Sequence, residues 1–422
     1  MIKRIILDSG LDSKIINKIN KSIIINYLRN NKLIPRQRIS RDLNISASTV
    51  SRVIDSLIKD HYVIGKEKMK AIGNKGGKRS TGLIINPEIG YVIGIDLGKE
   101  KMKANISNID GSFIKDYTGF NVVDDKIIIQ KLSKEIKRIL SDFKSPSFKL
   151  RAICIGIPAR VDINSGKIIA ATYYKNWNDL DLKGTLTDEF KIPIYIENDS
   201  NLSALAEKNF GEGKGFSDIL YIEISKGIGS GIILDNHLYR SYRGFAGELG
   251  FSIPSVEGLG YSDKNQGYLE NKVSVYSLKC EAIKGIKIGK KSLITELVKN
   301  NLDKIDARII YEAAKLGDSF AIGLIERSIK YLSIVLGNAI LMLSPQIVII
   351  GGEVCSLPYV EDLLLVPLKD NIKRVVPFDM PKITTASLKE SSTRIGASFL
   401  AMESFFTSEF PFWISGKGYL NS

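Results

Sequence analysis

An asparagine and an aspartate follow a short apolar strand that the sequence predicts, and their side chains suit a ligand rich in hydroxyl groups. Asn198 and Asp199 come just after the run Ile194-Tyr195-Ile196 and offer an amide and a carboxylate. A ligand with several adjacent hydroxyls needs such donors and acceptors fixed on rigid elements in a cleft. The same pair is also typical of a cap for a helix that begins near Ser200, and the two roles are compatible.

The elements around this pair follow a pattern that occurs twice. Apolar periodicity predicts strands over residues 91–98, 104–109, 112–119 and 150–157, and a helix over residues 125–143, before the last strand. The pattern returns from residue 219, and residues 347–352 predict a strand that ends in a Gly-Gly turn. Such a hairpin-linked triple with a following helix and strand is typical of a ribonuclease-H-like lobe. We therefore predict an α/β body of two lobes with a cleft between them, the actin-like architecture.

Motifs along these elements resemble those of the ROK family, which groups bacterial sugar kinases with sugar-responsive repressors. The resemblance covers residues 88–402. It rests on six motifs in order: 94–98, 156–158, 197–201, 227–231, 247–250 and 351–352. It implies that the sugar is contacted by Asn198, Asp199, Glu248 and Glu270, above a floor shaped by Gly156 and Pro158. Asp199 stands at the position of the catalytic base in the family's kinases.

The phosphate-binding loops depart from the kinase pattern of the family. Asp96-Leu97-Gly98 is followed by Lys99-Glu100 where the kinases continue with glycine and threonine, and Lys226 replaces a threonine before Gly-Ile-Gly. A carboxylate is electrostatically wrong where phosphate charge would gather, whereas a lysine could bind phosphate. We expect phosphoryl transfer to be lost, so the body is not an enzyme, while an ATP-dependent sugar kinase remains the alternative.

The zinc site of the family is also replaced. Phe251 stands at the position of its histidine, and its three cysteines are replaced by Tyr261, Asp263 and Tyr268. These side chains cannot form a tetrahedral thiolate site, so we expect no metal and no other cofactor. We expect Tyr261 and Tyr268 to hold the loop by aromatic packing instead.

Positive charge is concentrated at the N-terminus. Residues 1–86 hold 18 Lys and Arg against 6 Asp and Glu, whereas the whole chain holds 60 against 46. Such a local excess attracts a polyanion, most often nucleic acid. Apolar spacing predicts helices over 13–31 and 35–43 and a third helix capped by Ser46, followed by strands at 61–65 and 83–85. A small helical domain without a nucleic-acid partner is the alternative.

This segment, residues 13–86, reads as a winged helix-turn-helix domain, the module that the family's repressors carry at their N-terminus. Small polar residues at the start of its third helix would let the backbone approach a DNA groove, and a Gly-Gly-Lys-Arg wing would enter the minor groove. The residues that we expect at double-stranded operator DNA are Arg36, Ser46, Ala47, Ser48, Thr49, Ser51, Arg52, Lys78 and Arg79.

The combination resembles the family's repressors of the xylose or N-acetylglucosamine type, which implies a sugar-responsive transcriptional repressor. We expect xylose or glucose as the monosaccharide effector, and a homodimer or homotetramer on a two-fold-symmetric operator. A DNA-binding scaffold without an effector is a further alternative. No apolar run is long enough for a membrane span, so we expect a cytoplasmic protein without a membrane partner. Residues 88–402 would form the body and residues 403–422 an aromatic-rich tail that covers an apolar surface or a subunit interface.

Overall fold

Three helices and a two-stranded antiparallel sheet form the N-terminal domain. The computed structural model describes residues 13–69, 80–98, 100–143, 149–162, 165–263 and 266–410. The elements are α2 (Ser13–Asn30), α3 (Arg36–Leu43), α4 (Ala47–Lys59), β1 (Val63–Met69) and β2 (Ser80–Ile85). All the helices and strands predicted for this segment are confirmed. The wing tip, with Lys78 and Arg79, lies outside the described residues.

The turn between α3 and α4 has the local chemistry that the sequence indicates. Asn44 ends α3 in the left-handed conformation, with a φ of 51°, which asparagine tolerates better than most residues. The Ser46 hydroxyl then accepts a hydrogen bond from the Thr49 backbone N–H and caps α4. The inner face of α4 buries Val50, Val53, Ile54 and Leu57, whereas Ile58 is 37% exposed.

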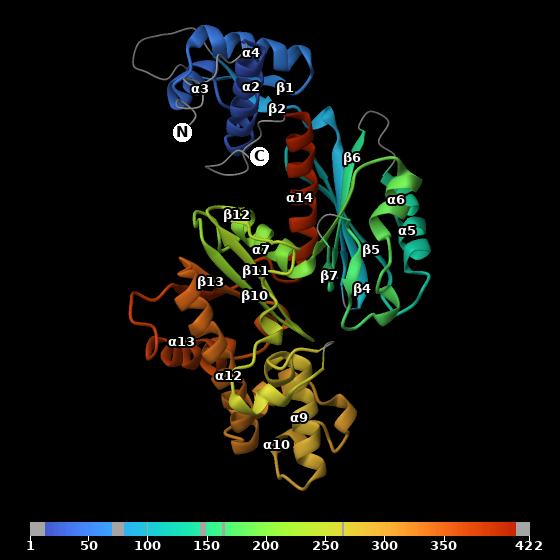
Figure 1. Ribbon diagram of the computed structural model, residues 1–422, viewed down its shortest axis with the longest axis vertical. Helices are drawn as coiled ribbons and strands as arrows, with labels where there is room; N and C mark the ends of the chain where they lie inside the picture. Colours follow the sequence, from blue (N-terminus) through green and yellow to red (C-terminus); the bar gives the residue numbers. More distant parts are fainter. Residues whose placement is uncertain are drawn as a thin grey trace.

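The first lobe of the body is built on a five-stranded sheet with the order β5-β4-β3-β6-β9. Its strands are β3 (Tyr91–Leu97), β4 (Lys101–Asn108), β5 (Phe113–Asn121), β6 (Leu150–Ile157) and β9 (Ile194–Asn198). The first three are antiparallel neighbours, while β6 and β9 run parallel to β3. Figure 1 shows α5 (Ile128–Phe143) and α6 (Leu182–Phe190) on one side of the sheet. The free thiol of Cys154 is buried in β6.

The second lobe repeats this sheet. Its order is β12-β11-β10-β13-β14, and its strands are β10 (Ile219–Ile224), β11 (Ile228–Leu234), β12 (His237–Leu238), β13 (Ile347–Gly351) and β14 (Lys382–Thr385). The hairpins are antiparallel and β13 and β14 are parallel to β10. The two lobes therefore share one topology, which confirms the predicted pair of ribonuclease-H-like lobes.

Alternating side chains of β10 face two different cores, as the two-residue period of a strand requires. Leu220, Ile222 and Ile224 pack in one cluster with the helices of the second lobe, whereas Ile219 and Tyr221 pack in another. The second-lobe helices are α8 (Glu270–Val273), α9 (Val275–Lys287), α10 (Leu293–Leu297), α11 (Ala307–Lys315), α12 (Ser319–Leu343) and α13 (Val366–Lys373). Both faces of this sheet are thus covered.

Two helices cross between the lobes. The helix α7 (Asp199–Phe210) packs on β10 and β11, while α14 (Ser392–Glu409) packs across β3 and β6 and against α7 (Figure 1). The crossing is so close that a Cβ added at Gly396 would lie 1.9 Å from the Leu202 carbonyl oxygen. The absence of a side chain at this position therefore sets the distance between α7 and α14.

The predicted boundary of the tail at residue 403 is wrong, because α14 runs without interruption to Glu409. No glycine or proline lies between Glu403 and Pro411, so nothing ends the helix earlier. Phe405, Phe406 and Phe410 are buried, and the Phe410 ring meets Tyr62 of the N-terminal domain at 5.1 Å between centroids. The part of the expected tail that is described covers an apolar surface between the N-terminal domain and the body.

Among the described helices, none combines the length and the apolar character that crossing a membrane requires.

Candidate ligand cleft and nucleic-acid interface

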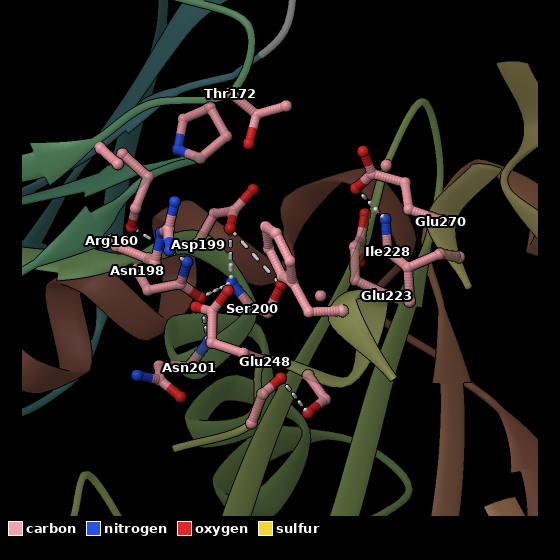
Figure 2. Close-up of a pocket in the computed structure, with 18 of the residues that line it drawn as sticks. Arg160, Thr172, Asn198, Asp199, Ser200, Asn201, Glu223, Ile228, Glu248 and Glu270 are labelled. Carbon is pink, nitrogen blue, oxygen red and sulfur yellow. Dashed lines mark hydrogen bonds between the residues drawn. The ribbon is translucent and has the colours of Figure 1, made fainter. Parts of the chain in front are cut away.

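A cleft between the two lobes gathers the polar residues that the sequence singles out. Its volume is about 730 Å³, including the part open to solvent. The first lobe contributes the turn after β6 and the start of α7, and the second lobe contributes the β10–β11 turn and the loop that follows β12. Figure 2 shows Asn198 and Asp199 on one side of the cavity, and Glu223 and Glu270 on the other. Pro158, Asn198, Asp199, Glu248 and Glu270 all line it.

Asn198 caps α7, as the sequence allowed. Its side-chain oxygen accepts hydrogen bonds from the backbone N–H groups of Ser200, at 2.9 Å, and Asn201, at 3.2 Å. Its amide nitrogen donates to the Ala159 carbonyl at 3.2 Å. Asp199 accepts a hydrogen bond from the Ser200 N–H through one oxygen, at 2.8 Å. Capping and the turn after β6 thus fix both side chains before a ligand arrives, and their contact with a sugar stays a prediction.

Glu270, on the opposite wall, connects its own segment with the β10–β11 turn and with Tyr173 of the first lobe. It stands at the first position of α8 and accepts hydrogen bonds from the Ile228 N–H at 2.9 Å and the Tyr173 hydroxyl at 3.1 Å. The pKa of Tyr173 is raised, first by burial and then by the charge of Glu270. Glu270 therefore orders the β10–β11 turn and Tyr173 at the edge of the cleft.

Glu248 lies between the other charged groups of the cleft. Although the residue keeps access to solvent, the pKa of its carboxyl is raised by burial, opposed by Arg160, and raised further by Asp199 and Glu270. Arg160 in turn stacks on the Phe251 ring at 5.1 Å from its centroid. The cleft thus holds several carboxylates, which can accept hydrogen bonds from hydroxyls, and the Arg160 guanidinium, which can donate them.

Gly156 was expected to shape the floor of the cleft, and this is wrong, because Gly156 is not among the residues that line it. A Cβ at Gly156 would lie 2.6 Å from a Thr393 methyl and 2.7 Å from a Leu202 methyl. The glycine therefore allows β6 to pack against α14 and α7, behind the cleft. Of Gly156 and Pro158, only Pro158 lines the cleft.

Four polar lining residues lie outside the six motifs and were not predicted: Arg160, Thr172, Tyr173 and Glu223. Glu223 had a detectable signal, since it is a lone carboxylate in the apolar run 219–224. It accepts hydrogen bonds from the hydroxyls of Tyr221 and Ser225, both at 2.7 Å. Arg160 begins the short strand β7 (Arg160–Val161), and Thr172 and Tyr173 lie in a loop, so only the folded chain brings these three to the cleft.

The region at the end of β3 is acidic. Burial raises the pKa of Asp96 to about 7, with Asp199 adding to the effect and Lys103 opposing it. Glu100 is exposed nearby, and Lys99 lies outside the described residues. Lys226, the other altered loop residue, places its ammonium 4.8 Å from the centre of the Tyr173 ring. A phosphate at this end would meet a carboxylate that already resists ionisation.

The residues at the family's zinc positions do not fit a zinc ion. The rings of Tyr261 and Tyr268 meet edge to face with centroids 5.5 Å apart, which confirms the predicted aromatic packing. Tyr268 also contacts Tyr331 at 6.3 Å and shares a hydrogen bond with Ser255 at 3.1 Å. Asp263 is exposed and accepts from the Gln266 N–H. Over the described ranges, no three His, Cys, Asp or Glu side chains are grouped so that they could hold a metal ion.

The start of α4 presents an open surface. Ala47, Ser48 and Arg52 are exposed, whereas Thr49 and Ser51 are half-buried. The Ser46 hydroxyl is engaged locally, with Thr49 Oγ1 at 2.8 Å and Ser48 Oγ at 3.2 Å. In the part of the chain that is described, Arg52 has no ion-pair partner. These features leave an uncovered helix N-terminus with one available guanidinium.

Arg36 has a different environment from the other residues expected at DNA. Its guanidinium donates to the Asp55 carboxylate at 2.6 Å and so joins α3 to α4. The pair is exposed, and such pairs contribute little to stability. Arg36 therefore keeps the two helices of the motif aligned, and its contact with DNA stays a prediction.

Known proteins resemble the chain over almost its whole length. A sequence model of the ROK family matches residues 92–404, and one of winged helix-turn-helix DNA-binding domains matches residues 17–64. The "Xylose repressor" of Caldicellulosiruptor bescii is 31% identical over 391 residues, which are 90% of this chain and 95% of that protein. The "Glucokinase" of Thermotoga maritima is 26% identical over 74% of this chain and 97% of its own length.

A solved structure gives the same fold. It is described as a ROK family transcriptional regulator, a homologue of the Escherichia coli MLC protein. It covers 95% of this chain and 99% of its own, with a TM-score of 0.77 and 20% identity. From the family match over residues 92–404, the two repeated lobes and the N-terminal domain, we conclude that this chain belongs to the ROK family and has a winged helix-turn-helix DNA-binding domain in front of its ROK body.

Proposed function

We propose that this chain is a DNA-binding transcriptional repressor that responds to a sugar. The observation that carries the proposal is the presence, in one chain, of an uncovered recognition helix and an interlobe cleft lined by fixed carboxylates and amides. The similarity to a xylose repressor over 95% of that protein's length supports the same function for the whole chain. Winged helices of this kind place the start of the second motif helix, here α4, in the major groove.

For the effector we propose a monosaccharide, with xylose as the first candidate because of the relative's name. Asp199, Glu248 and Glu270 reach the cleft from three different segments and can accept hydrogen bonds from several hydroxyls at once. Asn198 and Asp199 are held by backbone hydrogen bonds, so little side-chain entropy would be lost on binding.

We further propose that the chain does not catalyse phosphoryl transfer and needs no metal. Asp199 remains in the cleft at the position of a kinase base, which is the observation that favours the alternative of a sugar kinase. The exposed carboxylate of Glu100 opposes that alternative, because its charge disfavours a bound phosphate. The aromatic packing of Tyr261 and Tyr268 supports a loop that holds its path without zinc.

For the assembly we propose a homodimer or homotetramer that presents two winged helices to the two halves of a palindromic operator. A two-fold-symmetric protein matches the two-fold symmetry of such a site. Sedimentation of the full chain with and without the duplex gives the stoichiometry of the complex.

A sugar screen with a DNA-binding readout tests the proposal. The full chain is used to select duplex DNA from a random pool, and binding of the selected duplex is measured with D-xylose, D-glucose and D-ribose present in turn. One sugar should weaken DNA binding about 5- to 150-fold, the usual range of such coupling, and should raise the melting temperature of the protein. Asp199→Ala should abolish both effects. Sugar phosphorylation by ATP that Asp199→Asn abolishes would instead support the kinase.

A further inference from the structure

A buried ion pair joins the two lobes directly behind the cleft. Glu197 is the residue before Asn198 on β9 of the first lobe, and Arg240 follows β12 of the second lobe. The Arg240 Nε donates to Glu197 Oε2 at 2.6 Å, and the two side chains are 30% and 7% exposed. Breaking one partner of a buried pair leaves an uncompensated charge, so the geometry of this contact is strongly enforced.

Each partner also holds one wall of the cleft. The second oxygen of Glu197 accepts from the Asn198 N–H at 3.0 Å and from the Asn201 side-chain amide at 2.9 Å. The Arg240 carbonyl accepts from the Ala246 N–H at 3.4 Å, which closes the loop that carries Glu248. The ion pair therefore connects the residues that cap α7 with the loop that lines the opposite side.

On its far side, Arg240 lines a second cavity, of about 1540 Å³ including open solvent. This cavity separates the β12 edge of the second lobe from α2 of the winged helix. Asn26, Arg29 and Asn30 of α2 line one side of it, and His237, Leu238 and Arg240 line the other. The second lobe thus faces the winged helix across a cavity.

The winged helix itself is fastened to the first lobe. Arg29 forms an ion pair with Glu403 of α14, with side chains only 10% and 11% exposed, and its guanidinium stacks on Phe399 at 4.9 Å. Tyr62 donates a hydrogen bond to Glu409 at the end of the same helix. A rotation of the lobes would therefore move the β12 edge relative to α2, and Arg240 lies at the point where the cleft and this edge meet.

We propose that Arg240 is a positioning residue that couples the sugar cleft to the winged helix. Through Glu197 it transfers a change in the lobe angle, set by the ligand in the cleft, to the β12 edge that faces α2. This inference rests on the proposed function, because it concerns how sugar binding alters DNA binding.

The test compares the coupling between sugar and DNA in the full chain and its variants. DNA affinity for the selected duplex is measured with and without D-xylose and, separately, D-glucose; sugar affinity is measured by calorimetry without DNA. The ratio of interest is the DNA affinity without sugar divided by the DNA affinity with sugar. In Arg240→Ala and Glu197→Gln these two affinities should differ by no more than about twofold. Sugar should still bind Arg240→Ala, because Arg240 is not among the residues that line the cleft. Arg240→Lys, which keeps the charge, should restore part of the ratio and provides a folded variant if Arg240→Ala does not fold.

Arg243→Ala is the matched control, since Arg243 is exposed on the same loop and stacks on Tyr242 at 5.8 Å. It should retain the wild-type ratio. A wild-type ratio in all the folded variants at Arg240 and Glu197 would overturn the inference alone. A ratio of 1 in the wild-type chain for both sugars would overturn the proposed function and the inference with it.

Discussion

At the scale of single residues, ionisation of the Asp96 carboxyl destabilises the folded protein. It lies at the end of β3, where burial and the neighbouring Asp199 raise its pKa to about 7 from the ordinary value near 3.8. Between these two values the folded chain binds a proton that the unfolded chain has released. The contribution of Asp96 to stability must therefore fall as the pH rises from about 4 to about 7, and stay at the lower level above that range.

Asp96→Asn should remove this loss. We expect the variant to be more stable than the wild type at pH 8, and the difference to vanish near pH 4, where both side chains are neutral. Each unit of pKa shift corresponds to about 1.4 kcal/mol, and partial solvent screening reduces the expected gain to on the order of 1–2 kcal/mol. Urea unfolding at both pH values measures it.

The control for this series is Asp188→Asn, because the Asp188 side chain is 88% exposed. Its stability should differ little from that of the wild type at either pH. A gain for Asp96→Asn that is equally large at pH 4 would contradict the electrostatic explanation.

At the scale of elements, the close crossing of α7 and α14 positions the first-lobe wall of the cleft. Gly396→Ala would place a methyl group 1.9 Å from the Leu202 carbonyl oxygen, so the helices must separate. Overpacking of this kind costs about 1–3 kcal/mol. We expect a lower melting temperature and weaker sugar binding, measured by thermal unfolding and calorimetry.

Gly323→Ala makes the same chemical change but should have the opposite effect on stability. Gly323 lies within α12, and a Cβ there would meet nothing within 4 Å. Alanine favours a helix over glycine by about 0.5–1 kcal/mol, so this variant should be slightly more stable than the wild type. Destabilisation of both variants by the same amount would show that the crossing at Gly396 is not the cause.

The recognition helix α4 gives a second prediction at this scale. Arg52→Ala should weaken binding to the selected duplex and reduce the slope of log K against log salt concentration by about 1, if the guanidinium neutralises one phosphate. Fluorescence anisotropy at several salt concentrations measures both quantities. Lys59→Ala, at the other end of α4, should leave the slope unchanged, and an equal effect of the two substitutions would contradict the proposed docking of the helix start.

The sequence was sufficient where local chemistry determines the structure. The period of apolar residues gave β6 at its observed bounds, and the polarity of Asn198 and Asp199 placed them at the cleft because a strand ends there. The sequence was insufficient where the role of a residue depends on contacts with residues distant in the chain. Gly156 belongs to a sugar motif, but its methyl-sized space is filled by Thr393 and Leu202. That role depends on α14, which lies more than two hundred residues later.

At the scale of the whole molecule, one apolar cluster extends from the winged helix into the body. It contains Ile24 and Val53 of the N-terminal domain together with Val92 of β3 and Phe406 of α14. The rings of Phe406 and Phe410 stack at 6.3 Å, and Phe410 meets Tyr62 at 5.1 Å. Because this core is shared, the DNA-binding domain should not unfold independently of the first lobe.

Phe406→Ala tests this cooperativity. Phe406 is fully buried, and truncation of such a side chain costs about 3–5 kcal/mol. If the cluster acts as one unit, the loss should accelerate amide hydrogen exchange in α2 and α4 as well as in β3 and β6, although only the last two elements belong to the lobe that holds α14. Phe113→Ala, at a ring that is 62% exposed on β5, should leave exchange in α2 and α4 unchanged. Faster exchange confined to β3 and β6 in Phe406→Ala would mean that the winged helix is an independent domain, and that a sugar signal must reach it through the polar contacts alone.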